Sequence, residues 1–141
     1  MIIPAIAFMA VVMQAGQPGG WTWTLYEGEG PLVFANEVPD TPQLKATFEC
    51  APGSGVARVS VYGGGMQGGF ATLTSGDSSA TTEAEAGADR ATVPVRTDHP
   101  LFNQVMATGV LKIAVGDVNQ VVEVQPPFQA SLRRFGELCA G

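Results

Sequence analysis

The only histidine of the chain, His99, lies between Asp98 and Pro100. A histidine oriented by a neighbouring carboxylate is a common general base. The same tripeptide is typical of a helix start, because an Asp or His side chain can cap the first turn and proline suits the first helical position. No GxSxG nucleophile motif accompanies the pair. We therefore expect His99 to begin a helix, and a hydrolase that uses Asp98 and His99 remains an alternative.

Carboxylates are the next candidates for chemistry. Paired carboxylates can cleave glycosides, and six or more oxygens can hold Ca²⁺. Four of them lie close together in the sequence, among turn residues: Glu27, Glu29, Glu37 and Asp40. Two cysteines and one histidine do not provide a tetrahedral zinc set. We expect solvated turn carboxylates here, and we assign no catalytic residue, no metal site and no cofactor.

A glycine-rich segment lies near the middle of the chain. It lacks the Lys-Ser/Thr ending of a P-loop and the GxGxxG fingerprint of a dinucleotide-binding turn, so we expect a flexible hairpin loop instead of a phosphate cradle. Binding residues are concentrated on loops that a rigid scaffold presents. The candidate partner-binding loop therefore comprises Gly63, Gly64, Gly65, Met66, Gln67, Gly68 and Gly69.

The chain contains two cysteines, Cys50 and Cys139. An even cysteine count in an exported chain predicts a disulfide, which here closes a loop of roughly 90 residues and stabilises the fold by about 4–5 kcal/mol. The bridge would tie a C-terminal helix to the sheet. In a cytosolic chain the same residues would be two separate buried thiols.

The N-terminus supports export. Residues 1–13 form an uncharged apolar run of the length of a signal-peptide core, too short to span a bilayer, and cleavage after Ala15 is favoured by the small residues that follow. We expect a signal peptide at 1–15, a Gly/Pro-rich junction at 16–20 and a single β-rich domain at 21–141. The alternatives are a retained anchor and an integral first element of the fold.

The negative net charge and the distribution of basic residues indicate which classes of partner the chain can bind. The chain has thirteen acidic and seven basic residues, a net charge of −6, and its basic residues are scattered along the sequence. Nucleic-acid binding needs a clustered positive footprint, and an anionic membrane surface attracts one. We therefore expect no nucleic-acid partner and, after leader cleavage, no stable membrane anchor.

Short alternating or apolar runs between turn signals predict the elements that must position these residues. The strands are expected at 21–26, 32–35, 44–50, 56–62, 70–74, 78–86, 89–96, 110–115 and 119–124. Helices are expected from Pro100 to Gly109 and over 128–138. This pattern predicts an antiparallel β-sandwich or partly open barrel of about eight or nine short strands, with two short helices in the C-terminal half.

Two details of these strands concern possible contacts. Trp21, Trp23 and Leu25 share one face of the first strand, so we expect both tryptophans in the core; exposed, they would suit a carbohydrate or peptide surface. Pro94 indicates an edge position for the strand at 89–96, because proline donates no backbone hydrogen bond.

Several short segments together resemble small uncharacterised exported proteins of proteobacteria. They are Trp21-Thr22-Trp23, Phe48-Glu49-Cys50, His99-Pro100-Leu101-Phe102, Gly109-Val110-Leu111 and Arg133-Arg134-Phe135 ahead of Cys139. This resemblance implies export but no known activity. The chain is also loosely similar to periplasmic inhibitors of C-type lysozyme through Phe48, Cys50 and its C-terminal cysteine, although it has two extra helices and lacks a clear Ser-Gly loop with a following Tyr and Lys.

The sequence thus favours a non-enzymatic exported β-domain, periplasmic or secreted, that binds an envelope protein or glycan. The alternatives are a periplasmic hydrolase, a lysozyme-inhibitor-like protein, and a subunit of an envelope assembly that retains its apolar N-terminus.

The intact mass of the non-reduced protein from the envelope fraction of its native host tests this assignment. We expect a chain that begins near Gly16 and lacks two thiol hydrogens, because the leader is removed and Cys50 pairs with Cys139. A full-length mass with both thiols free would contradict export.

Overall fold

The computed structural model of the chain describes residues 18–141. The signal peptide predicted at 1–15 lies outside the described residues, as do the first two positions of the predicted junction. Within the described range, no helix is both long and apolar enough to cross a membrane.

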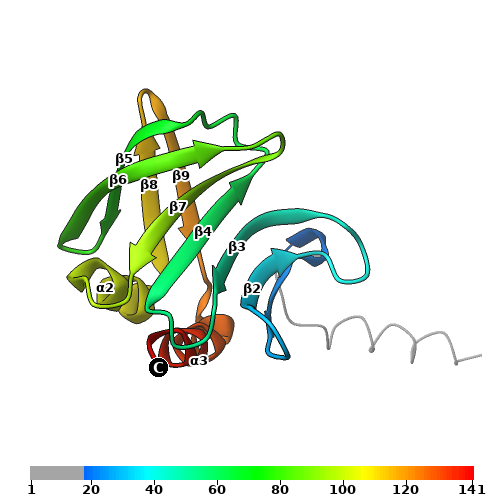
Figure 1. Cartoon of the computed structure of the whole chain (residues 1–141). Helices are drawn as coiled ribbons and strands as arrows, with labels where there is room; N and C mark the ends of the chain where they lie inside the picture. The colour runs from blue at the N-terminus through cyan, green and yellow to red at the C-terminus, as the bar shows by residue number, and fades with distance from the viewer. Residues whose placement is uncertain (1–17) are drawn as a thin grey trace, which may run out of the picture.

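Nine strands and two α-helices follow one another along the described chain, with two short 3₁₀ turns (Figure 1). The strands are β1 (Thr22–Tyr26), β2 (Leu32–Glu37), β3 (Leu44–Cys50), β4 (Val56–Tyr62), β5 (Gly69–Ser75), β6 (Ser78–Ala86), β7 (Arg90–Arg96), β8 (Val110–Val115) and β9 (Val118–Glu123). The helices are α2 (Pro100–Thr108) and α3 (Gln129–Ala140), and the 3₁₀ turns are η1 (Pro18–Gly20) and η2 (Pro126–Phe128). The prediction of a mainly β fold with two short helices in the C-terminal half is confirmed.

All strands are antiparallel and belong to one sheet in the order β1-β2-β3-β4-β7-β6-β5-β8-β9, which curls into a half-barrel (Figure 1). The hairpins predicted for β3–β4 and β8–β9 are confirmed. The two edge strands are β1 and β9. The indole Nε1 of Trp23 in β1 donates a hydrogen bond of 3.2 Å to the carbonyl oxygen of Glu123 in β9. A side chain therefore bridges these edges, which are not neighbours in the sheet order.

Alternating side chains fill the inside of the half-barrel. Trp23 stacks on Phe34 with ring centroids 4.8 Å apart, and Phe48 meets Phe135 of α3 at 5.9 Å. The residues of β4 that were predicted to face inward are buried: Ala57, Val59 and Val61. The core position predicted for Trp21 is wrong, because this residue precedes the first paired position of β1 and is only half-buried.

The predicted disulfide between Cys50 and Cys139 is confirmed, with an S–S distance of 2.04 Å. Beside it, the N–H groups of Gly53 and Gly55 donate to the carbonyl oxygens of Leu138 and Cys139, each at 3.0 Å. These carbonyls end a helix and have no partner within it. The C-terminal end of α3 is thus held covalently by the last residue of β3 and through backbone hydrogen bonds by the turn that follows.

The helix start predicted at His99 is also confirmed. The Nδ1 atom of His99 accepts a hydrogen bond of 3.0 Å from the backbone N–H of Leu101, and Pro100 occupies the first turn of α2. Gly109 ends the helix with φ +75°, a conformation in which a Cβ is strained.

The edge position predicted from Pro94 is wrong for β7 as a whole, because β7 lies between β4 and β6. However, β6 and β7 pair only at Glu85–Thr92 and Ala86–Ala91. The two strands part before they reach Pro94, as Figure 1 shows toward α2. Proline is tolerated here because only the β4 side of the strand is paired at this point.

Candidate functional site

The candidate loop, predicted over residues 63–69, joins β4 to β5 at the end of the half-barrel remote from α3, and its last residue, Gly69, is already the first of β5 (Figure 1). It was expected to be flexible, but the structure anchors its first half. The N–H of Gly63 donates to the carbonyl of Asp89 at 3.1 Å, and Nε2 of Gln120 donates to the carbonyl of Gly64 at 3.1 Å. Met66 is buried in the core with 9% of its surface exposed. The loop therefore covers the end of the barrel as part of the fold.

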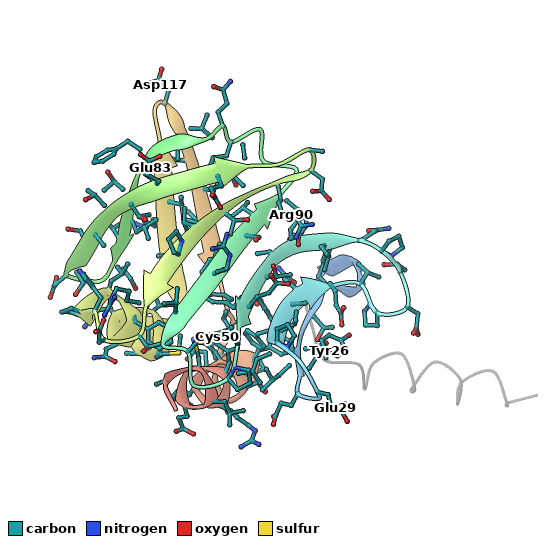
Figure 2. All side chains as sticks on the ribbon, viewed as in Figure 1. Tyr26, Glu29, Cys50, Glu83, Arg90 and Asp117 are labelled. Atoms are coloured by element: carbon teal, nitrogen blue, oxygen red, sulfur yellow. A yellow bond between two sulfur atoms is a disulfide. The ribbon has the colours of Figure 1, made fainter. Side chains whose placement is uncertain are left out.

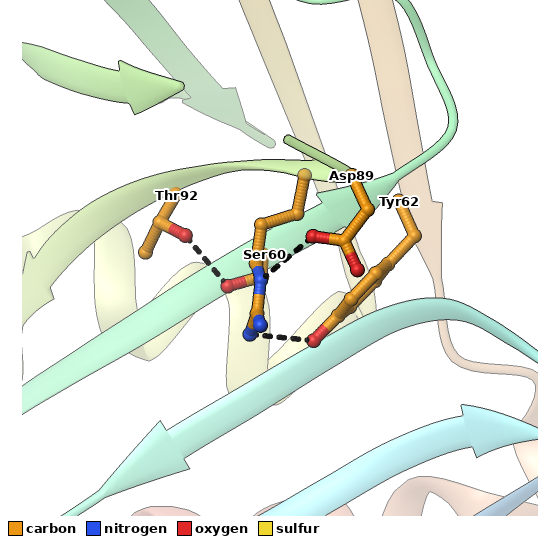
Figure 3. A network of polar contacts seen from close by, with 5 residues as sticks. Ser60, Tyr62, Asp89 and Thr92 are labelled. Carbon is orange, nitrogen blue, oxygen red and sulfur yellow. Dashed lines mark hydrogen bonds and ion pairs between the residues drawn. The ribbon is translucent and has the colours of Figure 1, made fainter. Parts of the chain in front are cut away.

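A polar and aromatic cluster lies beside this loop on the outer face of the sheet. Tyr62 and Arg90 are directly opposite each other on β4 and β7. The Arg90 Nη1 donates to the Tyr62 hydroxyl at 3.0 Å and its Nε to Asp89 Oδ1 at 3.3 Å, while the guanidinium lies 5.1 Å from the centre of the Tyr62 ring. Figure 3 shows these contacts next to the hydrogen bond of 2.8 Å between Ser60 and Thr92. Arg90 is thus held by an aromatic face, a hydroxyl and a carboxylate.

A second cation–π contact, between Lys45 and Trp21, lies in the same region. The Lys45 ammonium lies 4.5 Å from the centre of the Trp21 ring. Trp21 and Tyr62 both line one open hollow of about 480 Å³. We call this surface the loop-end hollow, and its lining residues are Trp21, Pro42, Gln43, Leu44, Tyr62, Gly63 and Asp89.

Two smaller hollows adjoin the loop-end hollow. One of about 180 Å³ runs under the first half of the loop and shares Gly63 and Asp89 with it. The other, of about 170 Å³, lies between β9 and residues of β1–β4, and it shares Tyr62. We call it the inner cavity, and its lining residues are Trp23, Asn36, Lys45, Ala46, Val61, Tyr62, Gln120, Val121, Val122 and Glu123. In the wall of this inner cavity lies Asn36, which is 7% exposed and whose Oδ1 has no hydrogen-bond partner. The three hollows are linked by shared lining residues, namely Val61, Tyr62, Gly63 and Asp89. Figure 2 shows Arg90, the neighbour of Asp89, far from Cys50.

The structure does not bring Asp98 and His99 together as a catalytic pair. The Asp98 carboxylate binds the Arg96 guanidinium at 2.7 and 3.0 Å, and this hydrogen bonding lowers the pKa of Asp98. The Nδ1 atom of His99 is engaged by the backbone of α2. Both residues thus serve the entry into the helix.

The carboxylates of the N-terminal third are likewise separated. Glu27 accepts two hydrogen bonds from Arg134 of α3, from Nε at 2.5 Å and from Nη2 at 2.8 Å, and this hydrogen bonding lowers the pKa of Glu27. Glu37 accepts from the Tyr26 hydroxyl, which raises the pKa of Tyr26. Among the described residues, no three His, Cys, Asp or Glu side chains gather in a way that would hold a metal ion.

Sequence reasoning located the loop but missed the cluster beside it. Tyr62 directly precedes the loop, and this adjacency was a usable signal. Arg90 and Asp89 lie at the site because β4 pairs with β7. These strands are distant in the sequence, so no local sequence pattern predicts their pairing.

Comparison with known proteins gives no match: no family model fits the chain, and no curated protein and no solved structure is significantly similar to it.

Replacing Met66 by Ala tests whether the loop is part of the core. We expect the free energy of unfolding to fall by about 2–3 kcal/mol, because a buried methionine side chain leaves a cavity at the end of the barrel. Gln67→Ala, one residue away on an exposed position, should change it by less than about 0.5 kcal/mol. Urea unfolding of both variants gives the comparison, and equal small effects would show that the loop is not anchored.

Proposed function

We propose that this chain is an exported, non-enzymatic binding module that holds a macromolecule of the cell envelope at its loop-end hollow. The observation that carries the proposal is the pair of rings, Trp21 and Tyr62, that line one open hollow of about 480 Å³, each with a cation over its face. Aromatic and arginine side chains at the centre of a contact surface supply most of the binding free energy in protein complexes.

The arrangement of these groups supports binding without a large ordering cost. Arg90 is already held by Tyr62 and Asp89, and the loop beside it is fixed by Gly63, Gly64 and Met66. Side chains and loops that are ordered before binding lose little conformational entropy when the partner arrives.

The disulfide supports the exported compartment. Bridges such as Cys50–Cys139 form and persist in oxidising surroundings, and they are rare in the cytosol. The apolar run at 1–13, in front of the described residues, supplies the sequence argument for a leader.

The positions of the titratable groups favour binding over hydrolysis. Asp98, His99 and Glu27 each have a partner within the fold, namely Arg96, the N–H of Leu101 and Arg134. The loop-end hollow contains a single carboxylate, Asp89, which binds Arg90. These contacts give the carboxylates structural roles at helix starts and between elements.

Tyr62→Ala tests the hollow directly. With the protein immobilised and an envelope extract of the native host passed over it, we expect the affinity for the retained partner to fall about thirtyfold, as for other aromatic residues central to an interface. Tyr62→Phe keeps the ring and should retain most of the affinity.

Tyr26→Ala is the matched control, because Tyr26 is 49% exposed, binds a charged partner and lines none of the three hollows. Equal losses for Tyr26→Ala and Tyr62→Ala, or no loss for Tyr62→Ala at an unchanged melting temperature, would contradict the proposed function.

A further inference from the structure

The outer edge of β9 is open for pairing. Val115 and Val118 flank the two-residue turn Gly116–Asp117, so they form the hydrogen-bonded pair that closes this hairpin. Because such pairs alternate along antiparallel strands, the backbone groups of residues 118, 120 and 122 point toward β8, and those of 119, 121 and 123 point away. The bond from Trp23 to the carbonyl of Glu123 agrees with this alternation.

β9 lacks two of the features that usually protect an edge strand, basic residues and proline. Val118–Glu123 contains no proline, lysine or arginine, and its one charged residue, Glu123, is the last of the strand. Val121 near the centre of β9 is 57% exposed. In the described part of the chain, no backbone hydrogen bond engages the outward N–H and C=O groups of Asn119 and Val121. This edge therefore offers two complete residues for pairing with another strand.

The inner cavity runs along the same edge. Four residues of β9 line it, opposite Lys45 and Tyr62, and these four are Gln120, Val121, Val122 and Glu123. The buried Asn36 in its wall has an acceptor oxygen without a partner. A strand lying along β9 can place a side chain that carries a hydrogen-bond donor at this cavity, where Asn36 is left unsatisfied.

Charge decides which strand fits. Asp117 directly precedes β9 and Glu123 is its last residue, so a carboxylate stands at each end of the strand. Figure 2 shows Asp117 at the tip of the hairpin. Two copies of β9 paired antiparallel would set Glu123 of one beside Asp117 of the other at both ends, where like charges repel. The chain also carries a net charge of −6. The edge is thus complementary to a strand whose two ends are basic.

We propose that β9 receives an extended polypeptide segment of a partner protein, with basic residues at both ends, as an added antiparallel or parallel strand. This inference rests on the proposed function and specifies the macromolecule as a polypeptide. The main-chain groups of Asn119 and Val121 hold the segment, and the acidic ends of β9 fix its register.

The test uses three fluorescent hexapeptides of alternating Val and Thr. The first has Lys at both ends, the second has Glu at both ends, and the third is the Lys peptide with alternate backbone nitrogens methylated on its pairing edge. Fluorescence anisotropy with the oxidised protein should show the Lys peptide binding about tenfold more tightly than the Glu peptide. Methylation should weaken binding about thirtyfold, because it removes the paired N–H groups.

A matched pair of variants addresses the protein side. Val121→Pro removes an N–H that faces away from β8, so it leaves the β8 ladder intact and should abolish binding of the Lys peptide. Val121→Thr keeps the N–H and the branched side chain and should bind normally. Hydrogen exchange should show the amides of Asn119 and Val121 becoming protected only when the Lys peptide is added.

Binding that survives both the methylated peptide and Val121→Pro would overturn the inference. So would amides of Asn119 and Val121 that are already protected in the free protein, since a second copy or the chain's own N-terminal segment would then cover the edge. If Val121→Pro retains envelope capture and Tyr62→Ala loses it, strand addition fails while the proposed function stands. If neither variant changes capture, both fail.

Discussion

The disulfide between Cys50 and Cys139 is the constraint on which the rest of this structure depends. It fixes the last turn of α3 against the end of β3, where Gly53 and Gly55 also bind the carbonyls of the helix. Phe135 is thereby held against Phe48, so the helix closes one end of a sheet that does not close on itself. Closing a loop of this length stabilises the fold by about 4–5 kcal/mol in the chain-entropy model. One end of the half-barrel is therefore rigid, covered and occupied by structural contacts.

The opposite end has a different character because the sheet remains open. The Trp23–Glu123 hydrogen bond bridges β1 and β9 at the end of β9 that leads into α3, and the inner cavity lies along β9, between this strand and the β1–β4 half of the sheet. The anchored loop covers this end with backbone and with Met66, while the charged and aromatic groups gather beside it. The disulfide and the packing of α3 are thus concentrated at one end of the half-barrel. The aromatic rings of Trp21 and Tyr62, with their cations, are accessible for binding at the other.

Patterns within short stretches of the sequence predicted most elements of the fold. Alternation predicted the β3–β4 and β8–β9 hairpins, cysteine count predicted the disulfide, and the Asp-His-Pro start of α2 followed from capping chemistry. What failed depended on distant contacts. The glycine-rich loop was expected to be flexible from its glycine content alone. The sequence of the loop does not reveal that Met66 is buried, because this burial depends on the strands that surround it. The pairing of Tyr62 with Arg90 required β7 to lie beside β4, and the Trp23–Glu123 contact joins residues 100 positions apart. Trp21 was placed in the core because alternation does not reveal where strand pairing begins.

The proposed binding surface lies at the loop end of the half-barrel and not at the end covered by α3. Site-specific photocrosslinking in living cells of the native host is the most direct test of this placement. A photoreactive residue at Gln43, exposed in the loop-end hollow, is compared with one at Arg133, exposed on α3. We expect a discrete adduct with an envelope macromolecule from position 43 and none from position 133. An adduct from position 133 with none from position 43 would contradict it.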